Sequence, residues 1–204
     1  MRSRHWFFLV GILLYLGGIA FVIAGARAAR RVAPAEAAAA TVTPVATVKQ
    51  IMKGIVGPAA TAVFNSVSTT VTSKGIEEKA PQTDEEWAAV RAHALVLLEA
   101  PNLLTMEGRK VAAHGEKSKF PEVELQPEQI QKLIDDDRPS FIRRARRLQD
   151  AATSALTAVQ AKDKGALFKA IESVDRACEN CHLHYWYPND ARAVQAAKET
   201  GVLD

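Results

Sequence analysis

The sequence predicts an all-α fold, an antiparallel four-helix bundle preceded by an N-terminal hydrophobic helix. Four long segments of the 204-residue chain place apolar residues at three-to-four spacing, the pattern of a helix with one buried face. The connections between them are short to medium in length, which favours antiparallel neighbours. Strand signals are weak, because the β-branched run over residues 63–71 follows a helical phase and has no partner run.

The N-terminal segment has the pattern of an exported protein. Residues 6–26 hold no charged side chain, and these 21 residues would span about 31 Å as a helix, enough to cross a bilayer. Small-residue cleavage sites follow at Ala24-Gly25-Ala26 and Ala26-Arg27-Ala28, as after a secretory signal peptide. Residues 1–28 are therefore either a transmembrane anchor or a cleaved signal peptide, and both alternatives stay open.

The rest of the chain divides into a tether and one domain. Residues 29–42 form an Ala/Pro-rich tether, since they offer few large apolar side chains to bury. Residues 43–204 have the size of one domain with its own core. Three of the 26 basic residues and no acidic residue lie in residues 1–28, so 23 basic residues face 23 acidic ones in the remainder. A nearly neutral domain has no basic field for phosphates, so nucleic acid is not expected as a partner.

The first helix is predicted to start at Thr43 and Pro44, an N-cap residue type followed by proline at the first helical position. Its apolar stripe comprises Val48, Ile51, Met52, Ile55, Ala59 and Val63. Pro58 lies inside this pattern and is expected to kink or split the helix near Gly57. The Ser/Thr run that follows, as far as Gly75, is predicted to be a loop.

The later helices follow from capping signals and periodicity. Residues 83–86 fit a capping box ahead of a second helix, which ends or kinks near Pro101. A long connection and a short helix over residues 128–137 precede a third helix from Pro139, and a fourth helix follows the turn at residues 163–165. A short final helix is predicted near the C-terminus, over about residues 190–199. The third helix carries four arginines, which are expected to lie mostly on its solvated face; docking of an acidic redox partner is their alternative role. They are Arg143, Arg144, Arg146 and Arg147.

The most specific motif is Cys178-Glu179-Asn180-Cys181-His182, in the fourth helix. It has the form C-x-x-C-H, the attachment signature of a c-type haem. On a helix, positions i, i+3 and i+4 share one face, so both sulfurs and the imidazole would lie together. The two thiols are expected to form thioether bonds to one porphyrin, with His182 as the proximal iron ligand. A single motif predicts a single covalent haem c.

Three other roles for the cysteine pair have weaker support. A thioredoxin-like redox pair is expected near a βαβ pattern, whereas the flanking sequence here is helical in pattern. A structural zinc site commonly takes four ligands from two separated pairs, and the chain contains only these two cysteines. A disulfide between positions this close would close a very short loop and constrain little.

A helical bundle with C-x-x-C-H near the end of its last helix resembles the class II c-type cytochromes, the cytochrome c-prime family. The resemblance covers about residues 44–190. It rests on the motif's position, the helix count and the first-helix pattern Val48-x-x-Ile51-Met52-x-x-Ile55-x-x-Pro58. The family divides by the sixth iron ligand: low-spin members use a Met of the first helix, whereas five-coordinate members leave that position open to small gases.

Met52 lies in the first helix, where the ligand of a low-spin member would be expected. The resemblance therefore implies Met52 as the candidate distal iron ligand, which suits electron transfer. Core packing is the alternative role for Met52, and a five-coordinate haem protein that binds or senses NO or CO is the alternative function. Weaker candidate ligands are Met106, His93, His114 and His184.

These inferences predict a monohaem electron carrier on the periplasmic side of the cytoplasmic membrane, because haem is attached to this motif on the exported side. Residues 6–26 would anchor it, or cleavage would release it into the periplasm. Its expected partner is another redox protein, and the resemblance leaves room for a homodimer. A peroxidase-type enzyme would need a distal acid–base pair, which the spacing does not identify, so no enzymatic activity is expected.

Overall fold

The structure, a computed structural model, describes Trp6, Gly11, residues 14–22, Ala24 and residues 42–203. The chain divides into two units, residues 1–42 and residues 43–204. In the first unit, residues 14–22 are helical. Within the residues that the structure describes, no helix is both long and apolar enough to cross a membrane. The predicted anchor over residues 6–26 lies partly outside these residues, as does nearly all of the predicted tether, so both stay predictions.

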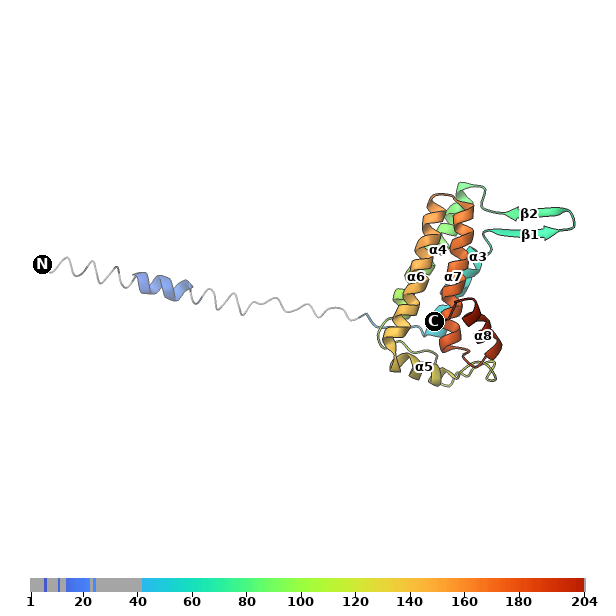
Figure 1. Ribbon diagram of the computed structural model, residues 1–204. Helices are drawn as coiled ribbons and strands as arrows, with labels where there is room; N and C mark the ends of the chain where they lie inside the picture. The colour runs from blue at the N-terminus through green and yellow to red at the C-terminus, as the bar shows by residue number, and fades with distance from the viewer. Residues whose placement is uncertain (1–5, 7–10, 12–13, 23, 25–41, 204) are drawn as a thin grey trace. The chain divides into compact units, whose positions relative to one another are not determined.

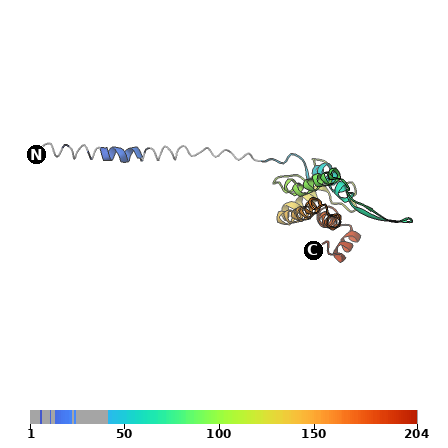
Figure 2. The same cartoon turned by 90° about the horizontal axis from the view of Figure 1, so that it is seen from above.

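The second unit is mostly helical, as predicted (Figure 1). In chain order its elements are α2 (Val48–Ile51), η1 (Met52–Val56), α3 (Gly57–Phe64), β1 (Ser68–Thr72), β2 (Gly75–Lys79), α4 (Asp84–Leu104), α5 (Pro127–Asp136), α6 (Arg138–Gln160), α7 (Lys164–Tyr185) and α8 (Ala191–Glu199). Helix α3 packs against α4, α4 against α6, and α6 against α7. Figure 2 shows these helices from above, nearly end-on.

Reciprocal capping hydrogen bonds define where two of the helices begin. The Thr47 hydroxyl accepts from the backbone N–H of Gln50 at 3.1 Å, and the Gln50 side-chain oxygen accepts from the backbone N–H of Thr47 at 2.9 Å. Helix α2 therefore begins just after Thr47, and the start predicted at Pro44 is wrong. The capping box predicted for the second long helix is present between Thr83 and Glu86.

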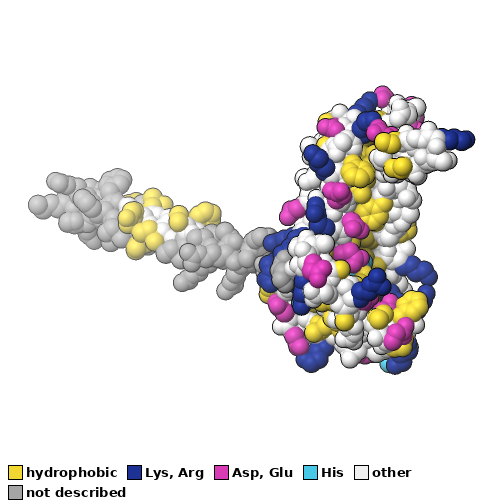
Figure 3. Space-filling model, turned by 45° about the vertical axis from the view of Figure 1, so that its right-hand side comes forward, with side chains coloured by type: hydrophobic (Ala, Val, Ile, Leu, Met, Phe, Trp, Pro, Cys, Tyr) yellow, Lys and Arg dark blue, Asp and Glu magenta, His cyan; other side chains and the backbone are white. Residues whose placement is uncertain are grey.

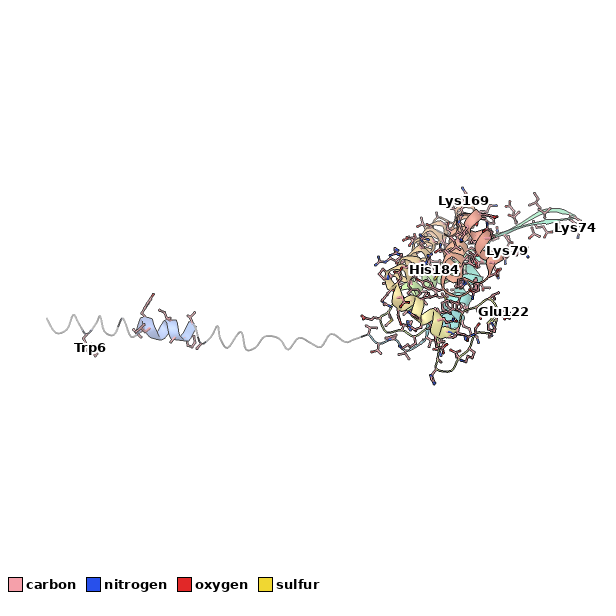
Figure 4. All side chains as sticks on the ribbon, turned by 60° about the horizontal axis from the view of Figure 1, so that its bottom comes forward. Trp6, Lys74, Lys79, Glu122, Lys169 and His184 are labelled. Carbon is pink, nitrogen blue, oxygen red and sulfur yellow. The ribbon has the colours of Figure 1, made fainter. Side chains whose placement is uncertain are left out.

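A β-hairpin occupies the segment predicted to be a loop, so the all-α prediction is wrong at this place. Strands β1 and β2 pair antiparallel, with Val71 opposite Ile76, and Lys74 lies at the tip (Figure 4). Gly75 has φ +128°, a conformation that suits glycine in a tight turn. Nearly every side chain of both strands is exposed, so burial imposes no alternation of apolar and polar residues on this segment.

The largest hydrophobic cluster of the second unit joins side chains of α2, α3, α4, α6 and α7. Phe141 and Tyr185 meet there edge to face, with ring centroids 5.6 Å apart. A second cluster, between α4, α6 and the start of α7, is built around Trp87 and Leu167. Together the two clusters pack α4, α6 and α7 against one another.

Truncating a core side chain tests this packing. Leu97 is fully buried in α4, and Leu97→Ala is expected to lower the free energy of unfolding by about 2–5 kcal/mol, because a cavity would remain. Leu95→Ala in the same helix is the matched control; Leu95 is 40 % exposed, so its loss should cost much less. Urea unfolding of both variants measures the difference. Equal costs at the two positions would contradict the packing described here.

Candidate functional site

The cysteine motif faces a cavity of about 320 Å³, which is near the lower end of the range of about 300–1,000 Å³ for ligand pockets. The first helical segment (α2, η1 and α3) lines one side, and α6 and α7 line the other. The apolar part of the wall includes Val48, Val56, Leu104, Phe141 and Leu148. A larger groove of about 460 Å³ lies on α6 and α7, but neither cysteine nor His182 lines it.

All three chemical groups of the motif reach this one cavity. Cys178, Cys181 and His182 lie in the last turns of α7 and line the cavity wall. Each is partly buried, and neither sulfur is in a disulfide. In the space-filling view, apolar side chains follow the length of the helical body on one face (Figure 3).

Met52 lines the same cavity, although it lies far from the motif in the sequence. It is the first residue of the π-helical turn η1, is half-buried, and lines the cavity together with the motif. The fold therefore brings a thioether, an imidazole and two thiols around one mainly apolar space. Met106, one of the weaker candidate ligands, does not line this cavity. Its sulfur accepts a hydrogen bond from the Arg109 guanidinium at 2.9 Å.

Burial keeps the thiols and the imidazole in their neutral forms. It raises the pKa of Cys178 to about 11, assisted by the neighbouring carboxylates of Asp175 and Glu179. It raises the pKa of Cys181 to about 12, although the Arg144 cation opposes this rise. Burial also lowers the pKa of His182, so its imidazole is uncharged at neutral pH, the form that binds metals.

Aromatic side chains surround the imidazole of His182. The ring centroids of Tyr187 and Trp186 lie 5.8 Å and 6.4 Å from that of His182. The Tyr187 hydroxyl lies 3.5 Å from a carboxylate oxygen of Glu179, at the limit of a hydrogen bond. Burial, together with that carboxylate, raises the pKa of Tyr187, so the phenol stays protonated. Trp186 also lines the cavity, so its ring is placed to pack against a ligand there.

Arg144 is a cavity residue that the sequence prediction assigned mostly to the solvated face of its helix. It is half-buried and lines the cavity from α6. One guanidinium nitrogen donates to the side-chain oxygen of Asn180, and another lies 3.3 Å from Nδ1 of His184. The signal was present in the sequence, because position 144 follows Phe141 by three residues and precedes Leu148 by four, in phase with the apolar stripe.

Three further histidines of the described residues, His93, His114 and His184, do not line the cavity. His93 is half-buried in α4, and His114 is exposed in the connection between α4 and α5. His184, labelled in Figure 4, is exposed, and its ring nitrogen Nδ1 lies near the guanidinium of Arg144. Within the described ranges, no group of three or more His, Cys, Asp or Glu side chains could hold a metal ion by itself.

The residues around the cavity fit a covalently attached haem. Two thiols and an imidazole on one helix face match the attachment and ligation chemistry of C-x-x-C-H. Met52 offers a thioether in the same space, and the apolar wall suits a macrocycle. Addition of a thiol S–H group across a vinyl group gives a thioether, so the two thiols are the reactants that such an attachment requires.

Comparison with known proteins gives one structural likeness. No protein-family model matches the chain, and no curated protein matches it. The chain is similar to a solved structure of the nitric oxide complex of a mutant of cytochrome c prime from Alcaligenes xylosoxidans. The match has 21 % sequence identity and a TM-score of 0.41, and it covers 70 % of this chain and 97 % of that chain.

Proposed function

We propose that the protein is a monohaem c-type cytochrome of the class II type that carries electrons. Cys178 and Cys181 attach the haem, His182 is the proximal ligand, and Met52 is the distal ligand. One observation carries this proposal: the C-x-x-C-H motif of α7 and Met52 of η1 line one mainly apolar cavity, although they lie near opposite ends of the domain sequence.

The bound haem would supply a one-electron Fe(III)/Fe(II) couple, and the protein residues would set its properties. Cys178 and Cys181 would hold the macrocycle through their sulfurs. The neutral imidazole of His182 and the thioether of Met52 would bind the iron, a ligand pair that raises the reduction potential. The apolar wall, which includes Val56 and Phe141, would limit the access of water to the bound group.

The location and the partner are part of the same proposal. The uncharged N-terminal segment, residues 6–26, supports export, with the domain either anchored at the periplasmic face of the membrane or released there. The partner is another redox protein, because an electron carrier must hand its electron to a second redox centre. No enzymatic activity of its own is proposed.

The absorption spectrum of the reduced protein, produced in a host that matures c-type cytochromes, tests the ligand assignment. Sharp α and β bands of a low-spin iron would support the electron carrier. A high-spin spectrum with ready CO binding would instead support a five-coordinate gas-binding protein and would exclude Met52 as a ligand. The two functions predict different spectra from the same sample, so the measurement separates them.

Arg144 is expected to raise the reduction potential of this site. A fixed positive charge in the cavity wall would disfavour the oxidised iron, because it repels the more positively charged form more strongly than the reduced form. Arg144→Gln should therefore lower the potential, as measured by redox titration. Arg144→Lys, which keeps the charge, is the control and should largely retain it. Equal losses in both variants would contradict an electrostatic role.

A further inference from the structure

A π-helical turn interrupts the first helical segment at the candidate distal ligand. The backbone N–H of Gly57 donates to the carbonyl of Met52, five residues earlier, whereas an α-helix would use a carbonyl four residues earlier. The turn η1 starts at Met52 and ends two residues before Pro58. Such turns are rare and frequently lie at functional sites.

Pro58 provides the physical cause of this turn. Proline has no backbone N–H, and in an α-helix its ring would collide with the carbonyl four residues earlier, here that of Gly54. A wider π turn moves that carbonyl away from the ring. Gly57 supports the same geometry, because a Cβ at this position would lie 3.0 Å from the Met52 carbonyl oxygen, closer than nearly all such contacts.

The turn changes which residues face the cavity. A row at four-residue spacing lines it, with Gly57 and Thr61 beside the row: Val48, Met52, Val56, Ala60 and Phe64. In a straight α-helix, four residues advance about 400°, so this row would drift by about 160° from its first member to its last. One extra residue in the wide turn offsets about 100° of that drift.

The exposed fractions of Ile55 and Val56 show this change in the residues that face inward. A continuous α-helix with Val48 and Met52 on its inner face would bury Ile55, as the sequence periodicity predicts. In the structure Ile55 is 39 % exposed and Val56 is 4 % exposed, so the buried position has moved by one residue at the π turn, whereas Ala59 and Val63 of the predicted stripe stay buried. The prediction of Ile55 as a core residue is therefore wrong, and the π turn is the reason.

We propose that Pro58 is a positioning residue: by maintaining the π turn, it keeps Met52 directed into the cavity while α3 stays packed on α4. Pro58 itself is exposed and its ring fills no core space, so its effect acts through the backbone. The consequence for iron ligation rests on the proposed function, whereas the consequence for the backbone does not.

Pro58→Ala in the full-length, haem-matured chain tests this role. The new N–H can donate to the Gly54 carbonyl, so the segment should return to α-helical register and turn Met52 away from the cavity. The low-spin α and β bands should then weaken and CO binding should increase. Gly57→Ala, which crowds the Met52 carbonyl, should perturb the same bands while leaving the proline in place.

Pro101→Ala is the matched control, because Pro101 is also an internal helix proline but lies in α4 and does not line the cavity. It should leave the spectrum unchanged, even if it alters stability. A spectrum of Pro58→Ala identical to that of the wild type would overturn the proposal.

Amide hydrogen exchange gives a readout that is independent of the sixth ligand. In Pro58→Ala the amide of residue 58 should be protected and the pattern over residues 52–57 should change to that of an α-helix. If the wild-type iron is already high-spin, the ligand assignment of Met52 fails, and exchange still decides whether Pro58 causes the turn. Unchanged exchange over residues 52–57 would overturn the role of Pro58 in either case.

Discussion

Replacing both Cys178 and Cys181 with alanine is expected to abolish covalent haem attachment. Thioether bonds to the porphyrin require the two sulfurs, and the chain has no other cysteine that could substitute for them. Haem staining after denaturing electrophoresis should change from strong in the wild type to absent in the double variant. The protein should still fold, because both side chains are only partly buried and alanine is tolerated in α7.

Single variants and a distant control sharpen this experiment. Cys178→Ala and Cys181→Ala each leave one sulfur, so partial staining is expected from each. Met52→Ala should stain like the wild type, because a lost axial ligand does not break a thioether bond. Staining of the double variant at the wild-type level would show that the cysteines do not attach a haem.

Met52→Ala is expected to convert a low-spin spectrum into a high-spin one. Alanine has no sulfur to bind the iron, and the shortened side chain enlarges the cavity next to it. Absorption spectra of the oxidised and reduced forms should lose their low-spin features, and CO should bind readily. The reduction potential should fall, because the thioether ligand that favours Fe(II) is lost.

Met106→Ala is a matched control for this substitution. Met106 is also a half-buried methionine, but its sulfur contacts Arg109 and it does not line the cavity. Its spectrum should equal that of the wild type. If Met52→Ala keeps the low-spin spectrum, a residue other than Met52 binds the iron.

The long helices and the motif could be predicted because their signals are local. Apolar residues at helical spacing predicted α4, α6 and α7, and the capping box at Thr83 is present. The same spacing predicted that Cys178, Cys181 and His182 share a helix face, and the structure directs all three to one cavity. What the sequence could not supply was the cavity itself, since its walls come from helices distant in the chain.

The hairpin was missed because its strands are almost fully exposed. Periodicity reports burial, and neither strand of this hairpin has a buried face. Val71 and Ile76, which face each other, are 80 % and 70 % exposed. The loop prediction therefore followed from the right observation, a polar Ser/Thr run, without the pairing that the tight turn at Gly75 permits.

Two details of the site were not predicted from the spacing of apolar residues: the π turn in the first helical segment and the place of Arg144 in the cavity wall. Pro58 signalled a disturbance of the first helix, but not that the disturbance would be a π turn that exposes Ile55 and buries Val56. Arg144 was assigned mostly to the solvated face because arginine is usually exposed, although its phase relative to Phe141 placed it on the buried side.

Covalent haem attachment is tested by the intact mass of the purified chain, produced in a host that matures c-type cytochromes. The mass should exceed that of the polypeptide by one haem after denaturation, with no free thiol at Cys178 or Cys181. A colourless chain of unmodified mass in which both thiols react with an alkylating reagent would contradict it.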